Sequence, residues 1–152
     1  MEAIKRPLLK DIVIFALNTG LRKKKILSLK WSNVDFETKC IILESFETKT
    51  KKRHVLLLNS RAWQVIKMRF KQRVEKCSYV FHRNGKKINS IRTAFENTLK
   101  RARIKNFHFY NLRYTFASYF LLLYGRRKRF FEAIICFFGI AELLFGVYIK
   151  KQ

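Results

Sequence analysis

Two arginines stand in settings that favour phosphate binding over simple solvation. Arg113 interrupts a helical stretch that is otherwise apolar, where a charged side chain is rarely present for solvation alone. Arg22 follows Thr19-Gly20-Leu21, and backbone near a glycine can bring a side chain close to phosphate; the alternative is one member of a solvated basic run, residues 22–25. A guanidinium is planar and permanently charged, so it can bind two oxygens of one phosphate. These two positions therefore indicate phosphate chemistry.

The charge of the chain supports a polyanionic partner. Its 152 residues include 34 Lys and Arg against 10 Asp and Glu, a net charge of +24. Residues 130–152 hold two charges of each sign, so the whole excess lies in residues 1–129. Such an excess favours nucleic acid first and an anionic membrane surface second; the alternative is a merely soluble basic surface. With 49% hydrophobic residues, disorder is excluded as the main state.

The sequence offers no metal or disulfide framework. Cys40, Cys77 and Cys136 stand far apart, and neither a CxxC pair nor an acidic cluster accompanies them. We therefore expect no cofactor, and a reducing, cytoplasmic compartment.

The hydrophobic pattern changes period along the chain and predicts a mainly helical α+β domain with a small antiparallel sheet. Helices are expected from Pro7 to the stop at Gly20, over 26–31, after the cap Asn59-Ser60, from Asn89-Ser90 through Arg103, and over about 110–123. Strands are expected over 40–43 and 54–58, joined by the polar stretch 48–53, and over 79–81 before a turn at Asn84-Gly85.

A basic body, residues 1–125, is followed by an apolar, divergent tail, residues 126–152. Residues 130–149 contain only two charged side chains, Glu132 and Glu142, over nearly the length of a transmembrane helix. Each carboxylate would cost about 2.5–3.5 kcal/mol at the bilayer centre. Packing into a core or on a neighbouring subunit is therefore favoured over a membrane span, and both interpretations stay open.

Four sequence stretches together resemble the catalytic domain of the tyrosine recombinases, the phage-integrase family. They occur in the family's order at compatible spacing, and the match covers about residues 7–124. The stretches are ALNTGLR (16–22), ILSLKWSNVD (26–35), TKTKKRHV (48–55) running into Leu58-Asn59, and NLRYTFAS (111–118). SIRTAFENTLKRARIK (90–105) also resembles the helix that precedes the family's second arginine.

The resemblance implies a site-specific recombinase that acts in the integration or excision of mobile DNA. In this family a tyrosine attacks a phosphate and forms a 3′-phosphotyrosyl link, and a hairpin lysine protonates the leaving 5′ oxygen. Two arginines stabilise the charge on the phosphoryl oxygens, and no metal is required. Double-stranded DNA is the implied partner, with a homo-oligomer assembled on it.

The family's roles can be carried over to particular residues. Arg22 matches the first arginine and Arg113 the second. Lys49 is the candidate hairpin lysine, with Lys51 as the alternative because the following strand allows two registers. The candidate DNA contacts are Lys51, Lys52, Arg53 and Tyr110; for the hairpin lysines the alternative is a solvated basic tip that touches phosphates only.

The chain departs from the family pattern at several of these positions. Tyr110 stands where the family has histidine; a phenol can donate a hydrogen bond but does not titrate near neutral pH. Lys25 replaces an acidic residue, and Leu57 replaces a proline. Beyond Gly125 neither the Leu-Gly-His box nor the Arg-Tyr nucleophile box is found. Tyr148, the single tyrosine of the tail after 125, is the candidate nucleophile; membrane-interface or core packing is its alternative role.

These departures suggest a history and two alternative functions. His to Tyr, Asp to Asn, Glu to Lys and Pro to Leu are each single G-to-A or C-to-T codon changes. The hypothesis is a recombinase gene that drifted toward AT-rich codons and shifted frame after about Leu123, which the other two frames of the encoding DNA would test. The alternative functions are a catalytically inactive DNA-binding remnant and a basic membrane-associated protein anchored by residues 130–149.

Overall fold

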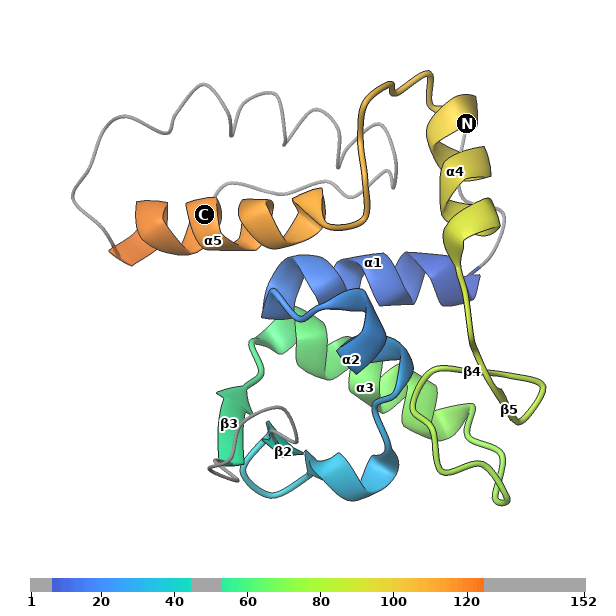
Figure 1. Cartoon of the computed structure of the whole chain (residues 1–152). Coiled ribbons are helices and arrows are strands. Elements are labelled where there is room, and N and C mark those ends of the chain that lie inside the picture. Colours follow the sequence, from blue (N-terminus) through green and yellow to red (C-terminus); the bar gives the residue numbers. More distant parts are fainter. Residues whose placement is uncertain (1–6, 45–52, 125–152) are drawn as a thin grey trace. The chain divides into compact units, whose positions relative to one another are not determined.

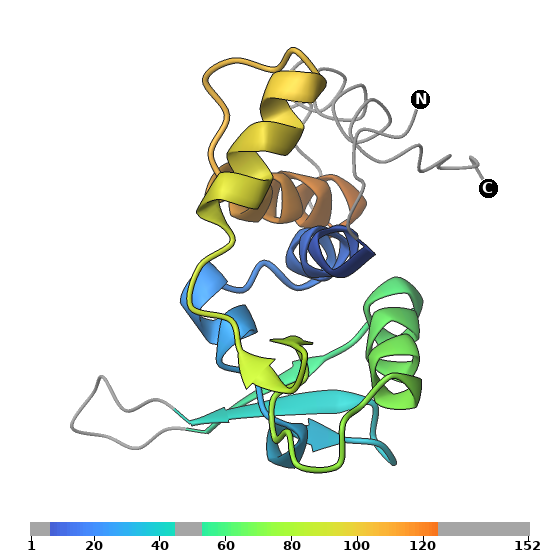
Figure 2. The ribbon, with the colours of Figure 1, turned by 90° about the vertical axis from the view of Figure 1, so that its right-hand side faces the viewer.

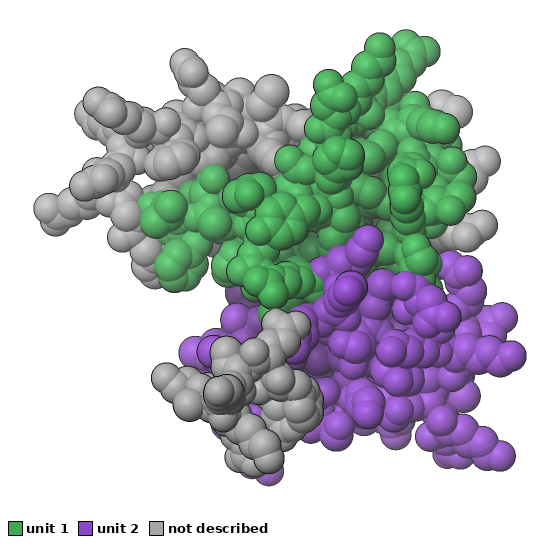
Figure 3. All heavy atoms as spheres, in the orientation of Figure 1, with its two compact units in different colours: residues 1–22, 90–152 green, residues 23–89 purple. Residues whose placement is uncertain are grey.

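The computed structural model describes residues 7–44 and 53–124, and the chain divides into two compact units. Unit 1 combines residues 1–22 with 90–152, and unit 2 comprises residues 23–89 (Figure 3). The tail and the segment 45–52, and with them Lys49, Lys51, Lys52 and Tyr148, lie outside the described residues. Within the described ranges, no helix is long and apolar enough to cross a membrane.

Unit 1 contains α1 (Pro7–Thr19), α4 (Arg92–Arg101) and α5 (Asn111–Tyr124). The expected helix from Pro7 to Gly20 is confirmed, with Gly20 in the left-handed region at φ 63° and its N–H donating to the Ala16 carbonyl at 2.9 Å. The apolar residues that recur at helical spacing in α1 are buried, namely Leu9, Ile12, Val13, Phe15 and Ala16. α1 packs against α5 (Figures 1 and 2).

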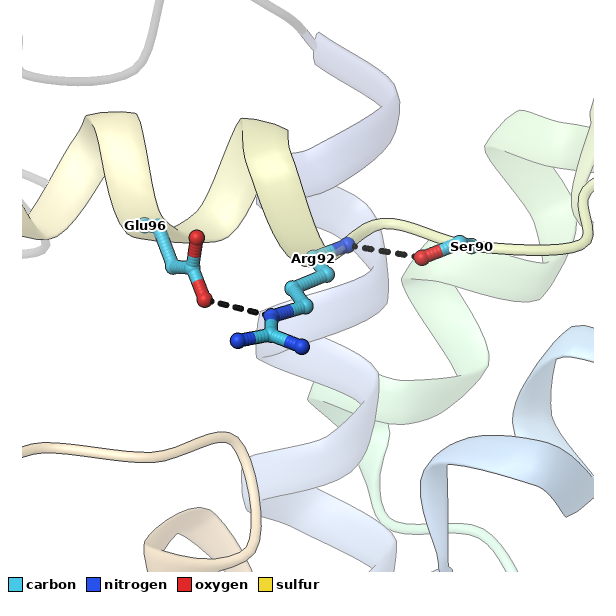
Figure 4. Close-up of polar contacts among 3 residues, drawn as sticks. All are labelled: Ser90, Arg92 and Glu96. Atoms are coloured by element: carbon cyan, nitrogen blue, oxygen red, sulfur yellow. Dashed lines mark hydrogen bonds and ion pairs between the residues drawn. The ribbon is translucent and has the colours of Figure 1, made fainter.

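Helix α4 is shorter than the sequence pattern predicted. It begins at Arg92, because Ile91 is not helical and the Ser90 hydroxyl accepts the Arg92 N–H at 3.2 Å, as Figure 4 shows. It ends at Arg101, because Arg103 adopts φ 57° and its N–H bonds back to the Lys100 carbonyl. The prediction of 89–103 was therefore wrong at both ends: local polar groups satisfy the backbone outside the helix.

Unit 2 is built on a three-stranded antiparallel sheet in the order β1-β2-β3. The strands are β1 (Val34–Asp35), β2 (Cys40–Glu44) and β3 (Arg53–Leu57) (Figure 2). In the register of β2 and β3, Cys40 pairs with Leu57. The two expected strands are confirmed. The sequence did not predict β1, because two residues are too few to show the alternation of apolar and polar side chains that marks a strand.

The expected helix over 26–31 was wrong, because two short elements take its place. α2 (Lys23–Leu27) ends at Leu27, and the Ser28 N–H that follows donates to the Lys24 carbonyl at 3.0 Å. The chain then turns extended at Lys30 and forms the 3₁₀ helix η1 (Trp31–Asn33). The apolar residues of this stretch, Ile26, Leu27 and Leu29, are buried all the same.

The third helix of the chain, α3 (Ser60–Lys71), begins where the cap predicted it. The Asn59 side chain accepts the Ala62 N–H at 2.9 Å, which satisfies one of the free donors of the first turn. Ala62, Val65 and Ile66 are buried, as the apolar face requires.

A two-stranded hairpin, β4 (His82–Arg83) and β5 (Lys86–Lys87), completes unit 2. The turn at Asn84-Gly85 is confirmed, and both residues have positive φ, 50° and 76°. The strand expected over 79–81 was wrong. Tyr79 forms an isolated bridge with Lys30 and Val80 donates to the Leu29 carbonyl at 2.9 Å, so this stretch pairs with the chain after α2 instead.

The hairpin carries a histidine whose titration should affect stability. His82 Nδ1 accepts the Gly85 N–H at 3.2 Å, and burial, then the positive charge of Arg69, lowers the pKa of His82 below 6.5. The folded state thus binds a proton less readily than the unfolded state, and this contribution to stability is lost as pH falls through and below about 6.5. We expect the melting temperature to fall with pH more steeply in the wild type than in His82→Asn, which keeps an acceptor. Equal slopes in thermal scans from neutral to acidic pH would contradict this assignment.

Candidate functional site

The end of α1 is pressed against the middle of α5 within unit 1. A Cβ added to Gly20 would lie 3.0 Å from Cγ and Cε1 of Phe116 and closer still to Cδ1. No side chain fits there, and the positive φ of Gly20 disfavours one as well. Glycine at this position therefore permits the close approach of the two helices.

The chain that leaves α1 is held by Thr19. Its hydroxyl donates to the Phe15 carbonyl at 2.7 Å and accepts the Leu21 N–H at 3.4 Å. Thr19 is buried and Leu21 half-buried, whereas Arg22 is exposed. The turn thus presents Arg22 at the surface, two residues after the contact between Gly20 and Phe116.

Arg113 occupies the first turn of α5, one turn before Phe116. The Asn111 side chain accepts the His108 N–H at 2.9 Å, and the Asn111 N–H donates to the His108 carbonyl at 2.9 Å, which organises the entry into the helix. Leu112 is buried and anchors this turn, and Arg113 beside it is half-buried. The buried neighbour orients the turn and leaves the guanidinium at the edge of the core.

Two tyrosines accompany Arg113 on the same helix end. Tyr110 is 54% exposed and Tyr114 61% exposed, and their rings meet edge to face with centroids 5.1 Å apart. Exposed phenols can donate O–H hydrogen bonds to phosphate oxygens. Tyr110 was singled out by the sequence, whereas Tyr114 was not proposed as a site residue; its position four residues after Tyr110 was the available signal.

The remaining candidates belong to unit 2 or lie outside the described residues. Arg53 opens β3 opposite Glu44, so the β2–β3 hairpin leads directly into the segment 45–52 that contains Lys49, Lys51 and Lys52. Lys25, which stands at the acidic position of the family pattern, is half-buried in α2. In the ranges 7–44 and 53–124, no cluster of His, Cys, Asp and Glu could hold a metal ion.

The chain is similar in sequence to known proteins. The model of the phage integrase family matches residues 3–122. The chain is 31% identical over 123 residues to the integrase of Salmonella phage P22, an alignment that covers 73% of this chain and 32% of that protein. The chain therefore spans about a third of the length of this relative.

The solved structures show a similar fold. The Tn1549 transposon integrase in complex with transposon right end DNA has a TM-score of 0.64 at 20% identity, covering 93% of this chain and 54% of that chain. The XerA recombinase has a TM-score of 0.57 at 18% identity, covering 96% of this chain and 60% of that one. The fold agrees with the family match over residues 3–122, and that match establishes that the chain belongs to the phage integrase family, the tyrosine recombinases.

Proposed function

We propose that this chain is the catalytic part of a site-specific recombinase that binds double-stranded DNA in the cytoplasm and cleaves and rejoins its strands. The chemistry would proceed through a 3′-phosphotyrosyl intermediate. The phage integrase family and the DNA-bound Tn1549 integrase of similar fold support DNA as the partner. The proposal includes a homo-oligomer assembled on the DNA, as the family resemblance implies.

One observation carries this proposal: Gly20 packs directly on Phe116. Arg22 follows Gly20 by two residues in the chain that leaves α1, and Arg113 precedes Phe116 by one turn of α5. Both arginines therefore lie close in sequence to the contact between α1 and α5. Two guanidinium groups presented from one helix pair can bind the oxygens of a single phosphate. They would stabilise the charge that develops there during strand transfer.

The other residues take roles that follow the family pattern. The Tyr148 oxygen would attack phosphorus and lose its proton to water, while the bond from phosphorus to the 5′ oxygen breaks. Lys49, or Lys51 in the other register, would protonate that leaving oxygen. Lys52 and Arg53 would contact flanking phosphates, and the exposed Tyr110 would donate a hydrogen bond to a phosphate oxygen. The basic body, 1–125, would carry the DNA contacts, with 126–152 as a separate tail.

A second candidate function, an inactive DNA-binding remnant, is favoured by the tyrosine pair. Tyr110 and Tyr114 are both exposed, and Tyr110 stands where the family has a histidine. A phenol, unlike an imidazole, does not ordinarily change charge near neutral pH, so it does not reproduce the acid–base role of a histidine. Phosphate binding by Arg22 and Arg113 would survive this change, whereas cleavage would not.

Covalent capture separates the two functions. The full chain is incubated with a pool of nicked duplexes of randomised sequence, and adducts are separated on a denaturing gel. We expect an adduct with the wild type and with the control Tyr119→Phe, and none with Tyr148→Phe. An adduct in Tyr148→Phe would assign the attack to another tyrosine. Binding without any adduct would establish the inactive remnant, and the absence of binding would overturn both.

A further inference from the structure

The β4–β5 hairpin places two cations directly opposite each other. Arg83 pairs with Lys86 in the ladder, and Lys87 follows in the same strand opposite His82. Arg83, Lys86 and Lys87 are all exposed. Like charges at directly opposed positions destabilise a hairpin, so this arrangement needs a reason other than the stability of the isolated fold.

The neighbouring loop adds further positive charge. Gly85, at the tip of the hairpin, lies against Val74, because a Cβ built on Gly85 would be 3.6 Å from Val74 Cγ1. The residues on either side of Val74 include the exposed cations Arg73 and Lys76 and one carboxylate, Glu75. We call Arg73, Lys76, Arg83, Lys86 and Lys87 the hairpin patch. Within the described part of the chain, no carboxylate forms an ion pair with any of these five side chains.

Aromatic rings hold two of these cations in place. The Lys87 ammonium lies 5.5 Å from the centroid of the Tyr79 ring, and the Arg73 guanidinium carbon lies 3.8 Å from that of Phe70. A ring face attracts a cation without cancelling its charge, unlike a carboxylate. Two members of the patch are therefore positioned by aromatic rings, and they remain positive for an anionic ligand.

We propose that the hairpin patch is a phosphate-binding surface for the backbone of duplex DNA, in unit 2 and additional to the Arg22–Arg113 pair of unit 1. The inference rests on the proposed function in that its partner is DNA. A duplex backbone presents a row of phosphates that can meet several cations at once. The hairpin tip itself carries only Asn84 and Gly85, and one exposed apolar side chain, Val74, lies beside it among five cations. This surplus of charge over apolar surface favours a nucleic-acid backbone over a lipid surface.

The test removes the opposed pair and measures binding of the full chain to a short fluorescent duplex at several salt concentrations. In Arg83→Gln/Lys86→Gln, we expect Kd to rise about tenfold. The negative slope of the logarithm of the association constant against log salt should become shallower by about two, since each phosphate contact contributes roughly 0.9. The melting temperature should stay the same or rise, because a repulsion is removed. This combination of weaker binding and undiminished stability is specific to a ligand-binding role.

Two control variants complete the design. Arg61→Gln/Lys67→Gln removes the same charge from exposed positions of α3 outside the patch, and it should change the salt slope less. Arg83→Lys/Lys86→Arg keeps both charges and should bind like the wild type.

The possible outcomes separate this inference from the proposed function. If the wild type binds DNA and the patch variant keeps the wild-type slope, the hairpin patch is refuted while DNA binding stands. If the patch variant loses binding only to phosphatidylglycerol vesicles, the surface serves lipid and the inference fails. Failure of the wild type to bind DNA would overturn the proposed function, and the inference with it.

Discussion

Replacing Arg113 with alanine is expected to abolish covalent capture of DNA and to weaken DNA binding. The guanidinium would contact the phosphate whose charge rises in the transition state, so its loss should slow cleavage by about 10³-fold or more. The measurement is the single-turnover rate of adduct formation on nicked duplex, with Kd determined in parallel. Because Arg113 is half-buried beside the anchoring Leu112, the fold should survive, and the melting temperature serves as the check.

Two further variants show what Arg113 contributes. Arg113→Lys keeps the charge but loses the planar fork, so we expect most of the DNA affinity to remain while cleavage stays low. Arg101→Ala removes a cation whose Nη2 donates to Thr98 within α4, and it should leave the cleavage rate near that of the wild type. Unchanged cleavage in Arg113→Ala would remove this residue from the site.

The second large effect is expected at Gly20. In Gly20→Ala the left-handed backbone should cost about 1–2 kcal/mol, and the overlap of the new methyl group with the Phe116 ring about 1–3 kcal/mol more. Urea denaturation should therefore show a loss of about 2–5 kcal/mol in the free energy of unfolding. The folded fraction should also bind DNA less tightly, because the helix ends that present Arg22 and Arg113 are pushed apart.

A double-mutant cycle tests whether close packing is the cause. In a Phe116→Ala background the ring is absent, so Gly20→Ala should cost only the backbone part, about 1–2 kcal/mol. Phe116→Ala alone measures the loss of the packed ring. If the losses of unfolding free energy in Gly20→Ala and Phe116→Ala simply add in the double variant, the close approach of α1 to α5 does not depend on having glycine at position 20.

Elements with strong local signals could be predicted from the sequence. The stop at Gly20, the cap at Asn59 and the turn at Asn84-Gly85 each depend on backbone preferences of a few residues, and all three are present. The strand at 79–81 and the helix at 26–31 were wrong for one common reason. These two stretches are apolar and buried, and they pair with each other across a long separation in sequence, which a local period cannot reveal.

The sequence by itself determined the family, through four motifs in the family's order, and it supplied the candidates for the chemistry: guanidinium groups in unusual settings and a charge of +24. Only the tertiary structure decided which of these groups share a unit and what holds them there. The contact of Gly20 with Phe116 joins α1 to α5 across most of the chain, and the β4–β5 register sets Arg83 opposite Lys86. The physical reason is that packing and strand pairing are non-local: they depend on which surfaces meet, and no single stretch of sequence encodes that.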